Sequence, residues 1–294
     1  MKKILLLFVS LCLLIIPTSC STPEMKLVNK IADAENQELS QLTFFEINIL
    51  KNAIFSLSGY RYAGDRPWLY EYFYNYKGEE KSSAEWDMSM YSFPHPDTVQ
   101  EFKIDKKMKR AIANVRVALY NKIRSYKDIN AIDRALENEY KNHGGKIFGR
   151  SIKTFKDFSE SLQREIHGYN RIVSIIDNDS NFDACELLGV YMGSVVLLKN
   201  IIEAKNGKTF RSTLGWEISQ LVGITPKQEQ YDRNKLPDIV KSKLLILDTV
   251  IKKMKYSGMG DLPKEFKKDK MSIPVEDAPY DEYEDNSMQY SAAC

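Results

Sequence analysis

The side chains best suited to chemistry lie in the stretch YRYAGDRPWLYEYFYNY, residues 60–76. Arg61, Arg66, Trp68 and Tyr70 combine flat apolar rings with guanidinium donors. Such a mixture suits the binding of a sugar or a peptide, because aromatic and arginine side chains are favoured anchors at binding sites. The same rings would equally form a domain core. The stretch therefore predicts either a core or, with these four residues at the surface, a ligand-binding site.

A second stretch, DNDSNFD at residues 177–183, places carboxylates and amides at alternate positions, as a calcium loop does. The EF-hand pattern requires glycine at its sixth position and glutamate at its twelfth. Phe182 and Leu188 occupy these positions. We therefore expect a polar turn between two helices, with Asp183 or a neighbour as helix N-cap.

Histidines are too scattered along the chain to predict a metal centre. His95, His143 and His167 stand on different expected segments, and none is followed four residues later by His, Cys or Glu. No nucleophile elbow, phosphate-binding loop or dinucleotide fingerprint occurs. We expect no catalytic residue, metal or cofactor. A peptidoglycan-acting enzyme stays open as an alternative, since the carboxylate pair that cleaves glycans is defined by separation in space.

Residues 1–20, MKKILLLFVSLCLLIIPTSC, have a basic start, an apolar run and small residues before Cys20, which predicts a secretory signal peptide. The apolar run is too short to cross a hydrocarbon core of about 30 Å. Its ending, PTSC, resembles the lipobox of bacterial lipoproteins. That resemblance implies that Cys20 is lipidated and becomes the N-terminus, and Ser21 after it implies sorting to the outer membrane. The alternative is an ordinary signal peptide cut nearby, which would leave Cys20 as a spare thiol.

The charges of the chain are balanced. It has 42 basic and 40 acidic side chains, and removal of residues 1–20 takes away two lysines and no acid. A balanced mature chain has no electrostatic case for binding nucleic acid. The remaining cysteines, Cys185 and Cys294, do not make a disulfide framework, and we expect Cys185 to be a small buried hydrophobe.

Helical periodicity dominates the mature chain and predicts a mainly α fold. Apolar residues recur every three or four positions in residues 104–123, 129–140, 155–176 and 239–254. Residues 182–203 are apolar on several sides, and residues 209–224 also carry a broad apolar face. One alternative function follows, a protein–protein module that docks a partner on these two faces.

We divide the mature chain into a linker or helix at residues 21–38, a small helical and aromatic module at 39–127, a helical bundle at 128–266, and a tail at 267–294. The tail has six acids between residues 276 and 285 among prolines and small polar residues. It lacks the apolar residues that would offset the entropy of ordering, so we expect it to be disordered.

The module begins with a well-signalled helix. Thr43 and Glu46 have the spacing of a capping box, and Gly59 stands where a helix can end with a left-handed residue. Asn52 stands in the middle of the largely apolar stretch at residues 42–62. We expect it to hydrogen-bond irregular backbone that folds over the helix, because buried polar groups need partners.

These residues resemble the YARHG domain, a small presumed extracellular module of bacterial envelope proteins, over residues 42 to about 124. The family motif runs roughly L-R-N-x-I-[FY]-A-R-H-G. The matching positions are Leu50, Lys51, Asn52, Ile54, Phe55 and Gly59. The family's Ala-Arg-His is replaced by the sequence SLS at residues 56–58, so a function carried by that basic pair is not expected. The resemblance implies a location and a local fold, and it supplies no activity.

We expect a lipid-anchored protein of the bacterial cell envelope with a non-catalytic binding or scaffolding role. Its partners would be the membrane, through the N-terminal lipid, and peptidoglycan or another envelope protein.

Overall fold

The computed structural model describes residues 23–60, 62, 66–76, 86–98, 104–187, 190–224 and 231–257. Three sequence predictions lie outside these residues: the signal peptide with Cys20, Arg61 as a ligand-binding residue, and the acidic tail at 267–294. The expectation of a mainly α fold is confirmed for the described part of the chain. No helix in that part is long and apolar enough to cross a membrane.

The α-helices are α2 (Pro23–Asp33), α3 (Asn36–Gln41), α4 (Phe44–Leu57), α5 (Pro67–Tyr74), α6 (Lys106–Arg124), α7 (Ile129–His143), α8 (Phe155–Asn178), α9 (Met192–Lys205), α10 (Ser212–Val222) and α11 (Asp238–Ser257). Two short antiparallel strands, β1 (Lys146–Ile147) and β2 (Arg150–Ser151), form a hairpin with Lys146 opposite Ser151. Single 3-10 turns are η1 (Met88–Met90), η2 (Pro96–Thr98), η3 (Cys185–Leu187) and η4 (Arg233–Lys235).

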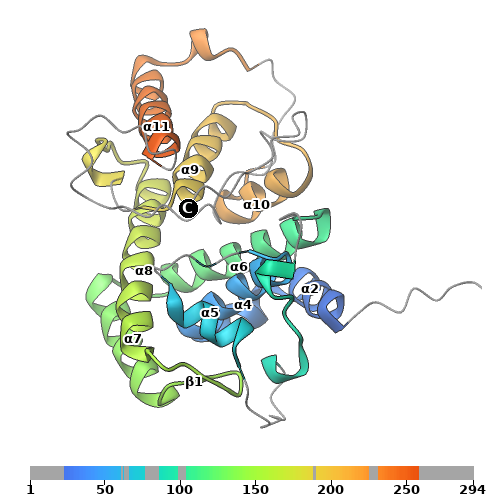
Figure 1. Cartoon of the computed structure of the whole chain (residues 1–294). Helices are drawn as coiled ribbons and strands as arrows, with labels where there is room; N and C mark the ends of the chain where they lie inside the picture. The colour runs from blue at the N-terminus through green and yellow to red at the C-terminus, as the bar shows by residue number, and fades with distance from the viewer. Residues whose placement is uncertain are drawn as a thin grey trace, which may run out of the picture.

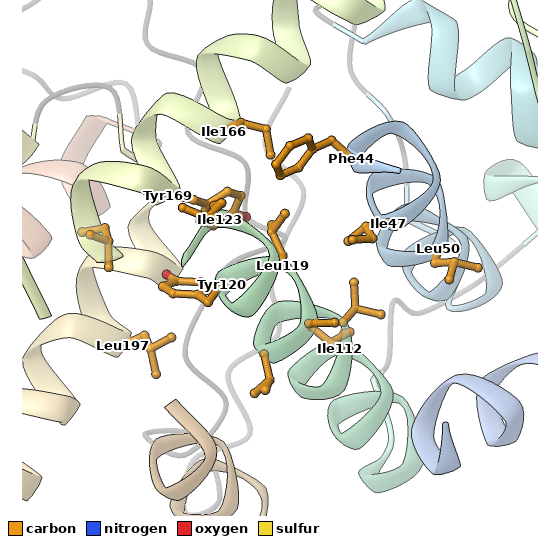
Figure 2. Close-up of a cluster of buried hydrophobic side chains, with 14 of the residues drawn as sticks. Phe44, Ile47, Leu50, Ile112, Leu119, Tyr120, Ile123, Ile166, Tyr169 and Leu197 are labelled. Carbon is orange, nitrogen blue, oxygen red and sulfur yellow. The ribbon is translucent and has the colours of Figure 1, made fainter. Parts of the chain in front are cut away.

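Helix α6 lies at the centre of the fold and packs against α2, α3, α4, α8 and α10. In Figure 1 α8 runs along the molecule, from α7 and the hairpin at one end toward α9 and α11 at the other. Figure 2 shows buried side chains from α4, α8 and α9 gathered around α6. One hydrophobic core contains residues from both the 39–127 and the 128–266 segments. A ligand site in either segment is therefore positioned by helices from both.

Both ends of α4 are closed as its sequence predicts. The Thr43 N–H donates to the Glu46 carboxylate at 2.8 Å, and the Glu46 N–H donates to the Thr43 hydroxyl at 3.1 Å, which forms the capping box. At the other end Gly59 has φ 82°, and the N–H of Tyr60 donates to the carbonyl of Phe55 at 3.0 Å. This is a Schellman motif, in which glycine takes the left-handed position at little cost.

Asn52 is buried, but its partners differ from those expected. Its amide donates to the backbone carbonyl and the side-chain oxygen of Asn48, both at 2.9 Å and both one turn earlier in α4. The irregular segment reaches the backbone of Asn52 instead, through the Tyr62 hydroxyl, which donates to the Asn52 carbonyl at 2.7 Å. The Asn52 side-chain oxygen accepts no hydrogen bond. The side chain therefore belongs to a polar centre within the core.

Residues 182–203 had the apolar pattern of a helix, but the described residues 182–187 are not α-helical. Helix α9 begins only at Met192, and η3 precedes it. The Asp183 carboxylate accepts the N–H of Glu186 at 2.9 Å, which supports a tight turn and leaves Cys185 exposed, so Cys185 is not the buried hydrophobe we expected. The apolar face of α9 packs against α8, α10 and α11, and α10 packs against α6. Most of the apolar surface that we expected to dock a partner is thus used inside the fold.

Candidate functional site

A buried charged centre joins α4 to α8. Lys51 and Glu165 form an ion pair, with 1% and 4% of their side-chain surface exposed. Glu165 also accepts hydrogen bonds from the Asn48 amide at 3.0 Å and from the Tyr191 hydroxyl at 3.1 Å. The Lys51 ammonium lies 5.6 Å from the centroid of the Tyr169 ring and donates to its hydroxyl at 3.3 Å. A buried ion pair of this kind is compatible with a stable fold because hydrogen bonds and rings also solvate the charges.

Arg66, one of the expected ligand-binding residues, belongs to this centre. Its guanidinium donates to the Tyr191 hydroxyl at 2.9 Å and lies 5.4 Å from the centroid of that ring. Burial raises the pKa of Glu165, but Lys51 and Arg66 outweigh it and hold the pKa below its usual value. The carboxylate is therefore charged at neutral pH, balanced by two nearby cations. The centre fixes α4, α5 and α8 relative to one another.

The aromatic stretch is divided between the core and the surface. Trp68 is only 8% exposed, so the prediction that it stands outside to bind a ligand was wrong and its interpretation as core holds. The reason is that α5 lies across α4 and α8, which turns Trp68, Leu69, Tyr72 and Phe73 inward. Tyr70 is on the opposite side of α5 and stays half-buried.

A partly exposed aromatic patch surrounds Tyr70 and consists of Tyr70, Tyr74 and His95. The Tyr70 hydroxyl and the His95 Nε2 are 2.7 Å apart, and the two rings meet edge to face with centroids 5.8 Å apart. Tyr74 packs edge to face on both, and the carboxylate of Asp97 lies 3.4 Å from the other ring nitrogen of His95. The aromatic stretch predicted Tyr70 of this group, whereas the sequence analysis did not indicate His95. The patch offers ring surfaces with polar edges, a combination that suits sugars and peptides.

An open apolar groove of about 420 Å³ lies between α2, the end of α4, the start of α6 and the segment that leads to His95. It is lined by Met25, Val28, Leu57, Ser92, Phe93, Pro94 and Met108. Val28 and Met108 are buried and form its floor, whereas Met25 is half-buried and Ser92 is exposed. Because four separate segments build it, no local sequence pattern indicates this groove.

Arg150 on β2 positions the wall of the groove. Its guanidinium donates to the backbone carbonyls of Tyr72 at 2.9 Å, Met88 at 2.6 Å and Tyr91 at 2.9 Å. It also lies 5.1 Å from the centroid of the Phe93 ring. One buried side chain thus attaches the segment 88–93, which has little regular structure, to α5 and to the hairpin.

Glu139 and His143, both on α7, bind polar groups at the N-terminus of α4. The Glu139 carboxylate accepts the N–H of Phe44 at 2.8 Å, and the His143 Nε2 lies 2.9 Å from the Thr43 hydroxyl. Burial raises the pKa of Glu139 to about 7, against the opposing effects of Lys122 and the backbone N–H groups. Burial also lowers the pKa of His143. The spacing of Glu139 four residues before His143 would have indicated this pair, since such residues share a helix face.

The described residues contain no group of three or more His, Cys, Asp or Glu side chains that could hold a metal ion. The alternate acids of the DNDSNFD stretch are split between the end of α8 and η3. Asp177 pairs with Arg124, and Asp183 caps the turn. Comparison of the chain with models of protein families, with curated proteins and with solved structures finds no significant match.

Proposed function

We propose that this chain is a lipid-anchored protein of the bacterial cell envelope, related to the YARHG modules, with a non-catalytic binding or scaffolding role. Cys20 would carry the lipid, and the outer membrane would hold it. The observations that support a binding role are the groove beside α2, whose lining includes Pro94, and the aromatic patch of Tyr70, Tyr74 and His95, where His95 is the next residue in sequence. These surfaces offer apolar and aromatic contact area to a ligand.

Peptidoglycan is the ligand that we assign to the aromatic patch. Its glycan strands present flat hydrophobic faces with hydroxyl groups at their edges. The rings of Tyr70 and Tyr74 would contact those faces, while the Tyr70 hydroxyl and His95 would exchange hydrogen bonds with the edges. An envelope protein with a comparable peptide surface is the second partner that this chemistry fits.

Co-sedimentation with purified peptidoglycan sacculi tests the binding role. The chain from residue 21, which keeps every described residue, should sediment with sacculi. Tyr70→Ala should weaken the apparent affinity by about tenfold or more, as expected for a central aromatic anchor. Tyr140→Ala, which removes a half-buried tyrosine stacked on Phe155, is the matched control and should leave binding unchanged. Absence of sedimentation, or equal loss in both variants, would exclude the patch as a wall-binding site.

A peptidoglycan-acting enzyme is the second candidate, and one observation favours it. A carboxyl group with a pKa of about 7, such as Glu139, is typical of a general acid, and His143 lies one helical turn away. Against this, Glu139 already accepts a backbone N–H of α4, which explains its placement structurally. Release of soluble muropeptides from sacculi, lost in Glu139→Gln, would favour the enzyme over the binding protein.

A further inference from the structure

The groove beside α2 has the lining of a hydrocarbon site. Ser92 is the one polar residue among the seven that line it, and the other six are Met25, Val28, Leu57, Phe93, Pro94 and Met108. None of the seven is charged, so a polar group placed against this lining would lose its hydrogen bonds to water without gaining others. The volume of about 420 Å³ lies in the range of about 300–1,000 Å³ that small-molecule sites have. The lining therefore favours a flexible apolar chain.

The first turn of α2 brings the groove close to Cys20. Helix α2 begins at Pro23, three residues after Cys20, and Met25 in its first turn lines the groove. Three residues span at most about 10 Å even when fully extended. An acyl chain spans about 15 Å, which is half of a hydrocarbon core about 30 Å thick. A chain attached to Cys20 is therefore long enough to reach the groove.

Helix α6 holds the α2 side of the groove in place. The Asn114 amide of α6 donates to the carbonyls of Ile31 at 2.8 Å and Ala34 at 2.7 Å, which attaches the end of α2 to α6. Val28 of α2 and Met108 of α6 are both buried and form the floor of the groove. The groove is thus formed by packing within the fold, and a ligand does not have to build it.

We propose that the groove binds one acyl chain carried by Cys20 of the same molecule. This inference rests on the lipid anchor of the proposed function. Attachment selects this occupant, because a ligand joined by a short linker has an effective concentration of about 1 mM at its site, whereas a free lipid has to be captured from dilute solution. The unbranched thioether side chains of Met25 and Met108 adapt well to a flexible hydrocarbon.

The groove and a bilayer would compete for the anchor. A bilayer takes up every acyl chain on Cys20, whereas the groove would take one. The membrane would therefore hold the anchor wherever it is within reach, and the groove would cover a chain only while the protein is away from a bilayer. Exposed hydrocarbon drives self-association, so this cover would keep the protein monomeric between export and insertion into the outer membrane.

Chemical attachment of a hydrocarbon to Cys20 tests the proposal. The chain from residue 20, with Cys185→Ser and Cys294→Ser, has Cys20 as its one thiol. It is alkylated with N-hexadecylmaleimide or, for reference, with N-methylmaleimide. The hexadecyl conjugate should remain a monomer in size-exclusion chromatography and should unfold about 3 °C or more above the methyl conjugate, because the bound chain stabilises only the folded state. Micelle-like oligomers of the hexadecyl conjugate, or equal unfolding temperatures of the two conjugates, would overturn the proposal.

Variants of Ser92 show whether the hydrocarbon lies in the groove. Ser92→Trp places a large ring in the groove from an exposed position, so its hexadecyl and methyl conjugates should unfold at the same temperature. Ser92→Ala should keep the difference seen without either substitution. Each variant is compared with its own methyl conjugate, so a change in its intrinsic stability cancels. An undiminished difference in Ser92→Trp would refute the assignment of the chain to the groove.

Cys185 provides a matched control for the position of attachment. It is exposed on η3, which Figure 1 shows in yellow on the far side of α8 from α2. In a chain with Cys20→Ser and Cys294→Ser, a hexadecyl group on Cys185 should give no stabilisation and should cause self-association. Equal stabilisation from the two positions would contradict the proposal, because attachment beside α2 would then not select the occupant.

These tests are separate from the test of the anchor, because the hydrocarbon is attached chemically. If Cys20 is lipidated in cells but the hexadecyl conjugate is neither stabilised nor monomeric, the anchor stands and only this inference falls. If Cys20 is not lipidated in cells, the anchor and this inference both fall, whatever the conjugates show.

Discussion

Replacing Glu165 with glutamine should destabilise the fold more than replacing Lys51 with methionine. The two residues form a buried ion pair, so removal of either partner would at first be expected to cost the same. They differ because Arg66 also lies close enough to lower the pKa of Glu165. Without Lys51 the carboxylate keeps Arg66 as a counter-charge. Without the carboxylate two cations share a buried site.

The magnitudes follow from that asymmetry. Breaking a buried pair by removing one partner costs about 3–5 kcal/mol, because the other charge is left uncompensated. We expect that full cost for Glu165→Gln, although the new amide can keep contact with Asn48 and Tyr191. For Lys51→Met we expect about 1–3 kcal/mol, which reflects lost hydrogen bonds to Glu165 and Tyr169. The double variant should cost less than Glu165→Gln alone, since only one cation then lacks its carboxylate.

Urea denaturation followed by circular dichroism at pH 7 measures these costs. The reasoning would be refuted if Lys51→Met destabilised the protein as much as Glu165→Gln, or if the double variant were the least stable of the three. The pH dependence gives a second readout. Since the pKa of Glu165 is depressed in the fold, its stabilisation is present above the usual carboxyl pKa and is lost as the pH falls below it. Glu165→Gln should remove this acid-induced loss.

Three further predictions concern other parts of the molecule. The pKa of Glu139 is raised from 4.5 to about 7 in the fold. Between these pH values the folded protein keeps a proton that the unfolded chain releases. The free energy of unfolding should therefore fall by up to about 3 kcal/mol as the pH rises from 4.5 to 7. Glu139→Gln should remove most of this decline, as measured by urea denaturation at several pH values. If the free energy of unfolding of the variant fell with pH as steeply as that of the wild type, Glu139 would not be its source. Trp68→Ala should lower the free energy of unfolding by about 3–5 kcal/mol and Tyr70→Ala by about 1 kcal/mol, because only Trp68 is in the core. Thermal denaturation measures both losses, and equal losses would contradict the difference in burial between the two rings. In the chain from residue 21 with Cys294→Ser, Cys185 should react with Ellman's reagent as fast in the native state as after unfolding, and protection in the fold would show that it is buried.

The helices could be predicted where local chemistry specifies them. Residues 104–123, 129–140 and 155–176 became α6, α7 and α8, because an apolar stripe repeated every three or four residues must face a core. The ends of α4 followed from Thr43, Glu46 and Gly59, which act on backbone groups within one turn. Residues 182–187 were mistaken for helix because apolar content alone does not distinguish a 3-10 turn from a helix.

The candidate site could be predicted only in part. Composition marked residues 60–76 as a binding site or a core, but which rings face outward depends on how α5 lies across α4 and α8. Lys51 and Glu165 are separated by 114 positions and no spacing relates them. Lys51 in the middle of α4, between the apolar residues Leu50 and Ile54, was the available signal, since a buried charge needs a partner. The groove has no such signal, because its lining comes from four segments.

The most direct test of the proposed function is metabolic labelling of the full chain with radiolabelled palmitate in a bacterial host, followed by fractionation of membranes. The account predicts a labelled protein in the outer-membrane fraction, and loss of both label and membrane association in Cys20→Ala. Mass spectrometry of the mature N-terminus should find the lipid on Cys20. An exported protein that is unlabelled and cleaved at another residue would contradict the account.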